Sequence, residues 1–334
     1  MNPTDISLRS PAVPRVSVVI PTRNRPSLVV RAILSVLDQT CTEFEVIVVV
    51  DGPDAATETA VKAIRDRRLR CVVLDEAVGG SEARNRGVQA AHCDWIAFLD
   101  DDDEWLTTKL EKQLRLAEDS GARVVISCQV VGRYPGHDYL WPRRTPAEEE
   151  PICEYLFNRR TWFRGEGQLQ TSTLLVPRKL MQEVPFTRGL SKHQDTDWYV
   201  RVGAMENVAF RFVLEPLAIW HLGETRSTIV SRCQWTRSWR WLSSVRPKLT
   251  KRAYAGFIAT QLIGEAAAQG RGLKVAPFLL WKMFSLGQPG PMDLCLFFGN
   301  AILTPAVRTR LRRVMSRAKF RQPKIETSAM QTAR

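Results

Sequence analysis

Paired cysteines are missing from this 334-residue sequence. Its seven cysteines are an odd number, lie far apart and include no Cys-x-x-Cys pair. Zinc-binding and disulfide-rich domains instead place cysteines at short, repeated spacings. The sequence therefore argues against both kinds of domain. It predicts reduced thiols, which are typical of a protein in the cytoplasm.

Long apolar segments are also missing. The two best candidates, residues 275–286 and 294–303, are shorter than the roughly 20 apolar residues that a membrane-spanning helix needs. Residues 1–14 are polar, contain proline and lack the apolar segment of a secretory signal. We therefore expect no spanning helix, and we expect residues 1–14 to form a flexible arm.

Acidic residues are scarce in the C-terminal third. From residue 232 onward the chain has 19 Lys and Arg against 3 Asp and Glu, whereas residues 1–231 have 29 against 32. The overall charge of +13 therefore comes from the C-terminal third alone. Such an asymmetry predicts two unlike regions. We expect a globular domain over residues 15–231, a basic helical extension over 232–320 and a disordered tail over 321–334.

Short apolar segments alternate with helix-like patterns in the first hundred residues. Runs such as VSVVI are apolar throughout, as expected of strands buried on both faces of a parallel sheet. The predicted strands cover residues 15–20, 44–50, 69–74 and 95–99. Helical spacing follows them from Pro26, over 55–67, over 81–91 and from near Trp105. This repetition predicts an α/β fold with a doubly wound, mostly parallel sheet.

Polar residues follow three of these strands. Thr22 and Arg23 come after the first strand, Asp51 after the second, and the acidic run DDDDE at 100–104 after the fourth. The carboxyl ends of parallel strands share one edge of a sheet, where open α/β folds bind ligands. Adjacent carboxylates repel one another unless a cation holds them, and oxygen ligands favour Mg²⁺ or Mn²⁺. The alternative is a solvated turn that caps the next helix.

The segments VSVVIPTRNR, VIVVVDG, ARNRG and WIAFLDDDDEW together resemble family 2 of the glycosyltransferases, over about residues 15–230. The resemblance implies the GT-A fold and a nucleotide-sugar donor. It further implies that Asp102 binds the metal directly and that Asp100 lies nearer the ribose. The donor-binding residues that it implies are Pro21, Thr22, Arg23, Asp51, Arg84, Asp100 and Asp101.

A second group of polar residues is the segment HQDTDWYVR at 193–201, which has helical spacing. It resembles the family's Glu-Asp-x-Asp motif, which implies that Asp195 is the general base. The sequence departs from that motif at Gln194, where the family usually has Glu. Asp195 also suits a helix N-cap. Asp197 stays open as the alternative base, although a salt bridge with Arg201 at i+4 would equally explain it.

A histidine, His221, is the last residue of the segment 218–221, which ends another predicted short strand. The resemblance implies that His221 approaches the metal or the diphosphate. A lone histidine is more often structural than a ligand, so both interpretations of His221 stay open.

Tryptophans and basic residues interleave beyond residue 232. Trp235, Trp239 and Trp241 alternate with arginines, and basic residues flank the later apolar segments. This combination is typical of amphipathic helices at an anionic membrane surface. The alternatives are a helical lobe packed on the catalytic domain and a basic patch that binds nucleic acid.

We therefore expect an inverting, metal-dependent glycosyltransferase of the cytoplasm, peripheral to the inner face of the cell membrane. The expected donor is a UDP-sugar, and the expected acceptor is a hydroxyl of a glycan or lipid-linked glycan in bacterial-type polysaccharide or glycolipid assembly. We expect no nucleic-acid partner. One alternative is a sugar-nucleotide pyrophosphorylase, but such an enzyme needs a glycine-rich loop after the first strand, and the segment PTRNR contains no glycine. The other alternative is a non-enzymatic protein that binds nucleic acid or membrane through the basic C-terminal third.

Overall fold

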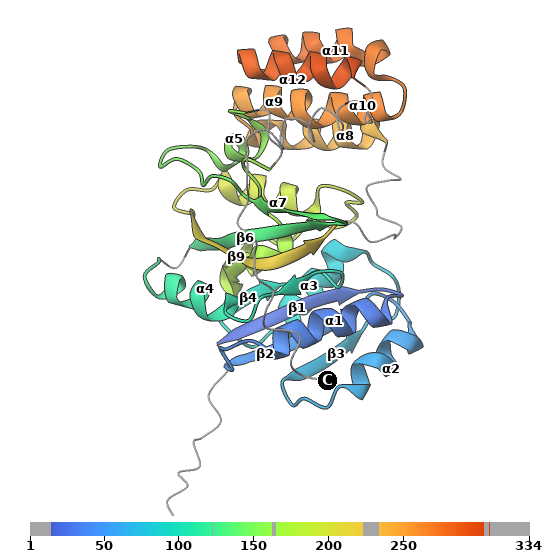
Figure 1. Cartoon of the computed structure of the whole chain (residues 1–334), viewed down its shortest axis with the longest axis vertical. Coiled ribbons are helices and arrows are strands. Elements are labelled where there is room, and N and C mark those ends of the chain that lie inside the picture. The colour runs from blue at the N-terminus through green and yellow to red at the C-terminus, as the bar shows by residue number, and fades with distance from the viewer. Residues whose placement is uncertain (1–14, 122, 162–164, 223–233, 304–306, 308–334) are drawn as a thin grey trace, which may run out of the picture.

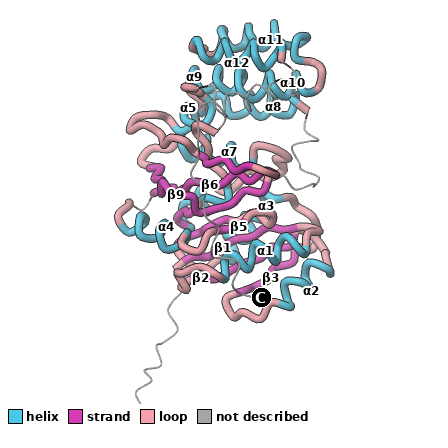
Figure 2. Tube along the Cα trace, viewed as in Figure 1, coloured by secondary structure: helices cyan, strands magenta, loops and turns pink. Residues whose placement is uncertain are grey.

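The computed structural model describes residues 15–121, 123–161, 165–222, 234–303 and 307. The predicted arm at 1–14, the predicted tail at 321–334 and the expected boundary at 231 lie outside these residues. Strands form one sheet in the lower part of the molecule, and layers of helices lie above it (Figures 1 and 2).

The first half of the sheet is parallel and has the strand order β3-β2-β1-β4. Its strands are β1 (Val16–Thr22), β2 (Phe44–Val50), β3 (Leu69–Val73) and β4 (Trp95–Phe98). The connecting helices are α1 (Pro26–Leu37), α2 (Ala55–Ala63) and α3 (Gly80–Ala90). The predicted strands are confirmed here, and the predicted helix over 55–67 is shorter than expected. The register pairs Thr22 with Val50, so the two strand ends lie together.

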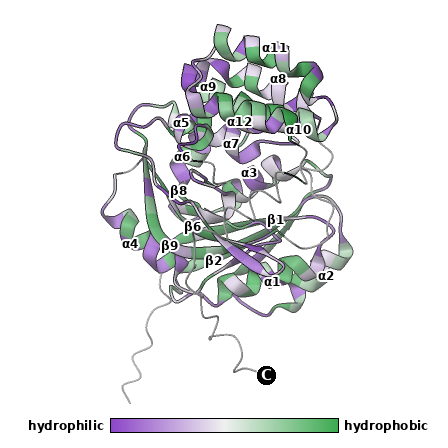
Figure 3. Cartoon of the chain, turned by 45° about the horizontal axis from the view of Figure 1, so that its top comes forward, coloured by the Kyte–Doolittle hydropathy of each residue, from purple (hydrophilic) through white to green (hydrophobic). Residues whose placement is uncertain are grey.

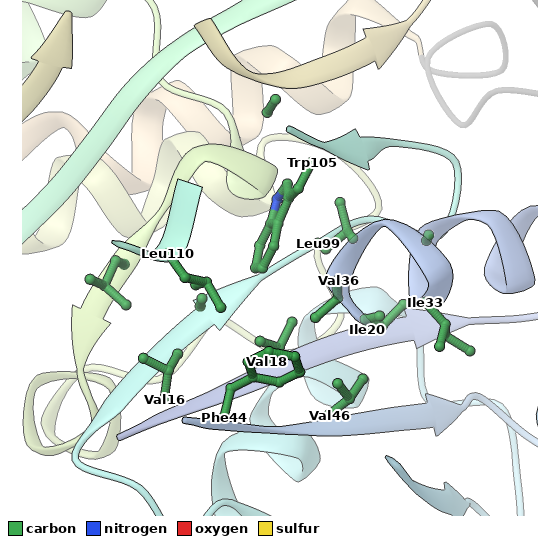
Figure 4. Close-up of a cluster of buried hydrophobic side chains, with 14 of the residues drawn as sticks. Val16, Val18, Ile20, Ile33, Val36, Phe44, Val46, Leu99, Trp105 and Leu110 are labelled. Carbon is green, nitrogen blue, oxygen red and sulfur yellow. The ribbon is translucent and has the colours of Figure 1, made fainter. Parts of the chain in front are cut away.

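Both faces of β1 are buried, as its continuous apolar run predicts. Val16, Val18 and Ile20 pack toward α1 (Figure 4), whereas Val19 belongs to the core on the opposite face. On that face Gly87 of α3 lies so close that an added Cβ would come within 2.2 Å of a Val19 methyl carbon. The glycine of ARNRG therefore allows α3 to press against the strand that carries the first turn.

The second half of the sheet is mixed. Strand β8 (Leu175–Pro177) runs antiparallel to β4, and β6 (Val124–Tyr134) runs parallel to β9 (Ala209–His221). Two short strands complete the sheet, β5 (Glu104–Trp105) against β9 and β7 (His137–Trp141) against β6. The remaining elements of this half are α4 (Lys109–Glu118), α5 (Ile152–Phe157), a 3₁₀ turn η1 (Thr171–Thr173), α6 (Arg178–Glu183) and α7 (Gln194–Gly203).

The expected helix start near Trp105 is wrong. Trp105 lies in β5, its indole nitrogen donates a 2.7 Å hydrogen bond to the Ser172 carbonyl, and α4 begins only at Lys109. The ring is buried beneath the Lys109 ammonium, which lies 3.9 Å from its centroid. A long-range contact therefore holds this tryptophan extended, and its local helical spacing does not decide its conformation.

The described part of the basic extension is entirely helical. It contains α8 (Trp235–Val245), a short turn η3 (Arg246–Lys248), α9 (Lys251–Phe257), a π-helical segment η4 (Ile258–Leu262), α10 (Ile263–Ala268), α11 (Gly272–Ser285) and α12 (Pro291–Ile302). Helices α11 and α12 form the outermost layer (Figure 1). Among the described residues, no helix is long and apolar enough to cross a bilayer.

These helices share a core with the rest of the chain. Phe157 of α5 and Val200 of α7 belong to the same buried cluster as Trp241, Leu242 and Phe257. Hydrogen bonds add to this contact, because the Ser238 hydroxyl joins His193 (2.8 Å) to Glu265 (2.6 Å), on α10. The extension therefore packs directly on α7, the helix that carries both candidate bases.

Candidate active site

The first turn binds the acidic run through two residues. Thr22 Oγ1 donates a 2.8 Å hydrogen bond to Asp101 Oδ2, and Arg25 Nη1 lies 2.9 Å from Asp101 Oδ1 and 3.2 Å from Asp102 Oδ2. Pro21 is half-buried in the same turn and Arg23 is exposed. Sequence reasoning missed Arg25, although it is the second arginine of the TRNR segment. Asp101 therefore faces the first turn, where Arg25 bridges it to Asp102.

Asp51 lies at the end of β2 and is buried. Its carboxylate accepts hydrogen bonds from the backbone N–H groups of Val78 (2.7 Å) and Gly79 (3.0 and 3.2 Å), just before α3. Gly79 has a φ of +87°, which a glycine adopts without strain. Asp51 therefore fixes the loop that leads into α3 and Arg84.

Arg84 connects the acidic run to α7. Its Nη2 atom lies 2.5 Å from Asp100 Oδ1, and its Nη1 atom donates to Gln194 Oε1 at 3.1 Å. Burial would lower the pKa of Arg84, but the Asp100 carboxylate raises it, so the guanidinium stays charged. Gln194, the position that departs from the family motif, thus meets Arg84 through a neutral amide. A fixed cation of this kind suits a phosphate ligand.

Three carboxylates converge beyond β4. Oxygen atoms of Asp100, Asp102 and Asp103 all lie within 4.8 Å of one another. Asp103 is fully buried, and its Oδ2 atom accepts hydrogen bonds from Gln170 (2.5 Å) and Ser172 (2.7 Å). Its Oδ1 atom has no hydrogen-bond partner among the described residues. Burial and the two neighbouring carboxylates raise the pKa of Asp103 well above its ordinary value.

This donor set fits a divalent cation. Three oxygen donors at one strand end, one of them buried and without a partner, match the preference of Mg²⁺ and Mn²⁺ for carboxylates. The predicted metal ligands were Asp102 and His221. Of these, only Asp102 is among the three converging acids of the described chain, and Asp100 and Asp103 were not predicted as metal ligands. The contribution of Asp103 has no local signal, because it depends on Gln170 and Ser172, nearly seventy residues away.

His221 lies on β9 beside the acidic run and hydrogen-bonds to Glu104. Its Nε2 atom lies 2.6 Å from Glu104 Oε1, and Arg31 Nε lies 3.6 Å from the same oxygen. The hydrogen bond from His221 lowers the pKa of Glu104. His221 does not belong to the converging group of acids in the described chain. In this structure it links β9 to β5, and its approach to a metal stays a prediction.

The two candidate bases have different surroundings. Asp195 is half-buried at the start of α7. Within the part of the chain that the structure describes, its Oδ1 atom accepts local hydrogen bonds, from the N–H and the hydroxyl of Thr196. Burial raises the pKa of Asp195, and the charge of Asp100 adds to this rise while Arg84 opposes it. Asp195 therefore interacts electrostatically with Asp100 of the acidic run and with Arg84.

Asp197 is committed to structural contacts. Its Oδ2 atom accepts hydrogen bonds from Thr187 (2.7 Å) and Arg201 (2.8 Å), and its Oδ1 atom accepts one from the indole of Trp241 (3.0 Å). The salt bridge with Arg201 is the one that the i+4 spacing predicts. Because both oxygens are engaged and buried, Asp197 is poorly placed to receive a proton from an acceptor.

Tyr199 is a further residue of this site, on the same helix as Asp195. It lies one turn after Asp195, is buried, and has a hydroxyl without a hydrogen-bond partner among the described residues. Burial and the charges of Asp195 and Asp100 raise its pKa well above the ordinary value. The phenol therefore stays protonated and remains a hydrogen-bond donor one helical turn from Asp195.

Comparisons with known proteins agree on a family. The sequence model of Glycosyl transferase family 2 matches residues 17–184. The amylovoran biosynthesis glycosyltransferase AmsB of Erwinia amylovora is 30% identical over 272 residues, which cover 78% of this chain and 87% of that protein. WfaP of Escherichia coli, described as a UDP-Glc:alpha-D-GlcNAc-diphosphoundecaprenol beta-1,3-glucosyltransferase, is 33% identical over 103 residues, 31% of this chain and 41% of that protein.

Solved structures of low sequence identity share the fold. TarS residues 1–349 of S. aureus, in complex with UDP-GlcNAc, match with a TM-score of 0.62 at 14% identity, over 92% of this chain and 93% of that one. The mannosyltransferase PcManGT of Pyrobaculum calidifontis, in complex with GDP-Man and Mn²⁺, matches with a TM-score of 0.51 at 17% identity, over 92% and 81%. The predicted GT-A fold, with its helical C-terminal extension, is confirmed.

Proposed function

Because this chain belongs to glycosyl transferase family 2 and uses a nucleotide-sugar donor, we propose that it is a metal-dependent enzyme that inverts the anomeric carbon of the transferred sugar. One observation carries this proposal. Arg84 contacts both Asp100 of the acidic run and Gln194 at the start of α7. The candidate base Asp195 therefore lies next to the cation and the acids that suit a sugar diphosphate.

The donor would lie along the edge formed by the ends of β1, β2 and β4. Pro21, Thr22, Arg23 and Asp51 would contact its nucleoside, Asp100 and Asp101 would border its ribose, and Arg84 would pair with its phosphates. Asp102, Asp100 and Asp103 would hold Mn²⁺ or Mg²⁺, which stabilises negative charge on the departing diphosphate when it is bound.

Asp195 would act as general base. Its carboxylate would remove the proton from the acceptor hydroxyl while that oxygen attacks C1 of the sugar and the bond from C1 to the diphosphate breaks. A single displacement of this kind inverts C1. The raised pKa of Asp195 makes it a stronger base than an ordinary aspartate, and the Tyr199 hydroxyl lies one helical turn away to hydrogen-bond a polar group of the substrate.

We further propose a UDP-sugar as the donor and a glycan or lipid-linked glycan as the acceptor, in bacterial cell-surface polysaccharide assembly. The support is the activity described for WfaP, the polysaccharide role in the name of AmsB and the UDP-GlcNAc complex of TarS. The proposed location is the cytoplasm, at the inner face of the cell membrane. Asp102 and the neighbouring acids carry the metal assignment, and His221 is retained as a further candidate.

The test is a screen of nucleotide sugars for Mn²⁺-dependent hydrolysis and transfer by the full chain. We expect one UDP-sugar to be consumed in the presence of Mn²⁺, with release of UDP, and little consumption in the presence of a chelator. Equal rates with and without the chelator would reject the metal dependence. Consumption of GDP-sugars alone would reject uracil as the nucleobase of the donor.

A further inference from the structure

Exposed apolar side chains gather on one part of the molecule. Eight of the eleven large hydrophobic residues that are exposed in the described chain lie between residues 273 and 307. Four of them are more than half exposed, namely Leu273 (69%), Trp281 (59%), Phe284 (58%) and Ile302 (64%). Single exposed apolar residues are ordinary on a protein surface, but a gathering of this kind marks an interaction site.

Helical spacing places these side chains on the outer faces of α11 and α12. On α11, Leu273, Trp281 and Phe284 share one face, whereas Leu279 and Met283 on the other face are buried in the core of the extension. On α12, Phe298 and Ile302 are exposed one turn apart, whereas Leu296 and Phe297 are buried. We call the exposed surface of Leu273, Trp281, Phe284, Phe298 and Ile302 the α11–α12 face.

The surroundings of the α11–α12 face are basic. Arg271 and Lys274 are exposed at the start of α11, and the Lys282 ammonium lies 4.4 Å from the centroid of the Trp281 ring. Residues 234–303 contain nine Lys and Arg and only two acids. Both acids are turned inward in this described segment, since Glu265 pairs with Lys192 at 2.6 Å and Asp293 accepts a hydrogen bond from the Gly290 N–H. Arg271, Lys274 and Lys282 thus give the apolar face a rim of positive charge along α11, and neither acid of the described segment is exposed beside it.

We propose that the α11–α12 face inserts into the headgroup region of an anionic membrane. Aromatic and aliphatic side chains beside lysine and arginine match the two components of such a surface, its apolar boundary and its negative charge. A second copy of this chain fits less well, because an isologous dimer would bring two positive rims together. Figure 3 brings these helices forward and shows hydrophobic and hydrophilic residues side by side along α11.

The orientation has a consequence for the acceptor, which rests on the proposed function. Figure 1 shows the layer of α8, α9 and α10 between the α11–α12 face and α7. With this face on the membrane, Asp195 is held away from the bilayer. The enzyme would then act on the sugar end of a lipid-linked glycan, at a distance from its lipid, and a soluble glycan with the same sugar end would also be an acceptor.

Substitutions on the surface test the proposal, because removal of the extension would expose the core that it shares with α7. The first variant is Leu273→Ser, Trp281→Ser and Phe284→Ser. Its matched control removes three exposed apolar residues of the sheet half, Leu34→Ser, Val73→Ser and Leu214→Ser. A second variant, Arg271→Glu with Lys274→Glu, is matched by Arg65→Glu with Arg67→Glu, which are exposed after α2.

The measurement is cosedimentation of the full chain with vesicles of phosphatidylglycerol and phosphatidylcholine, and of phosphatidylcholine alone, at low and high salt. We expect the wild type to bind the anionic vesicles, and we expect the triple serine variant to bind at least about tenfold more weakly than its control. The charge-reversed variant should lose at least about tenfold on anionic vesicles at low salt, and its control should bind like the wild type.

Several results would overturn the proposal. One is no vesicle binding by the wild type, and another is equal partitioning of a variant and its control. A third is a wild-type dimer in sedimentation velocity that becomes a monomer in the variants of the α11–α12 face and not in their controls. Hydrolysis of the donor without vesicles should be the same in all variants. If the wild type binds vesicles but consumes no nucleotide sugar, the proposed function fails while the membrane surface stands.

Discussion

The edge of the sheet and the outer helices treat charge in opposite ways. At the edge, carboxylates are buried or half-buried beside arginines, as in the pairs of Asp101 with Arg25 and Asp100 with Arg84. At α11 the cations Arg271 and Lys274 are exposed, and apolar side chains of α11 and α12 are exposed beside them. Clustered charge away from water indicates a site for a small charged ligand, whereas apolar surface rimmed by charge indicates a large amphipathic one. The two regions should therefore respond to different perturbations.

The largest effect is expected at the acidic run. Asp102→Ala should abolish turnover and the Mn²⁺-dependent binding of UDP, because it removes one of the three carboxylates whose oxygen atoms converge at this edge. Calorimetry with UDP and Mn²⁺ measures this binding. Asp94→Ala, an exposed carboxylate just before the same strand, is the control and should behave like the wild type. Unchanged binding in the Asp102 variant would remove the metal assignment.

The next effect separates Asp195 from Asp197. Asp195→Asn should leave the affinity for the nucleotide near that of the wild type and should lower the rate of transfer by at least about 10²-fold, the usual contribution of a general base. Rates at saturating donor and acceptor, with UDP affinity measured in parallel, test this. A rate within threefold or so of the wild type would show that another group takes the proton.

Asp197→Asn should act mainly on stability. It weakens the ion pair with Arg201 and disturbs the hydrogen bond from Trp241, which joins α7 to α8. Hydrogen bonds to a buried charged group contribute about 2 to 3 kcal/mol, and we expect a loss of that order in the free energy of unfolding. Urea denaturation measures it. If this variant instead keeps its stability and loses its rate, Asp197 is the base.

The smallest effect concerns pH and the contact between α7 and the extension. Burial lowers the pKa of His193 to about 3. In the unfolded chain the imidazole gains its proton near pH 6.5, so the unfolded state binds more protons between these two values. The contribution of His193 to the free energy of unfolding should therefore be fully present above about pH 6.5 and should decrease as the pH falls toward 3.

His193→Asn provides the comparison, because asparagine tolerates the positive φ of 62° at this position. Urea midpoints at pH 7 and pH 5 should differ less in this variant than in the wild type. An identical difference in both proteins would show that His193 contributes nothing to the acid sensitivity.

The sequence predicted what depends on local pattern. Strands buried on both faces are continuous apolar runs, so β2 was predicted at its observed bounds, and the polar residues after β1, β2 and β4 were expected at one edge. What failed depends on contacts between distant segments. Trp105 is extended because of Ser172, and Ser172 lies in a 3₁₀ turn in which the Thr173 hydroxyl donates a 2.6 Å hydrogen bond to the Gln170 carbonyl. No periodicity encodes such pairs.

The site divides in the same way. Asp100, Asp102 and Arg84 stand in recognisable motifs, and the structure brings all three together. The roles of Gln170, Ser172 and Trp241 became visible only in three dimensions, because each of these residues meets its acid across tens of residues of chain. Composition predicted amphipathic helices in this region. Which residues of α11 and α12 are buried and which are exposed could be identified only from the packing of the extension.

The central claim is that a single displacement takes place at the edge where Arg84 joins the acids to α7. The most direct measurement is the anomeric configuration of the first product, read by proton NMR from the coupling constant of the transferred sugar before any equilibration. We expect an anomeric configuration opposite to that of the sugar in the nucleotide donor. A product that keeps the donor's configuration would contradict it, because a general base at Asp195 and one in-line displacement cannot retain C1.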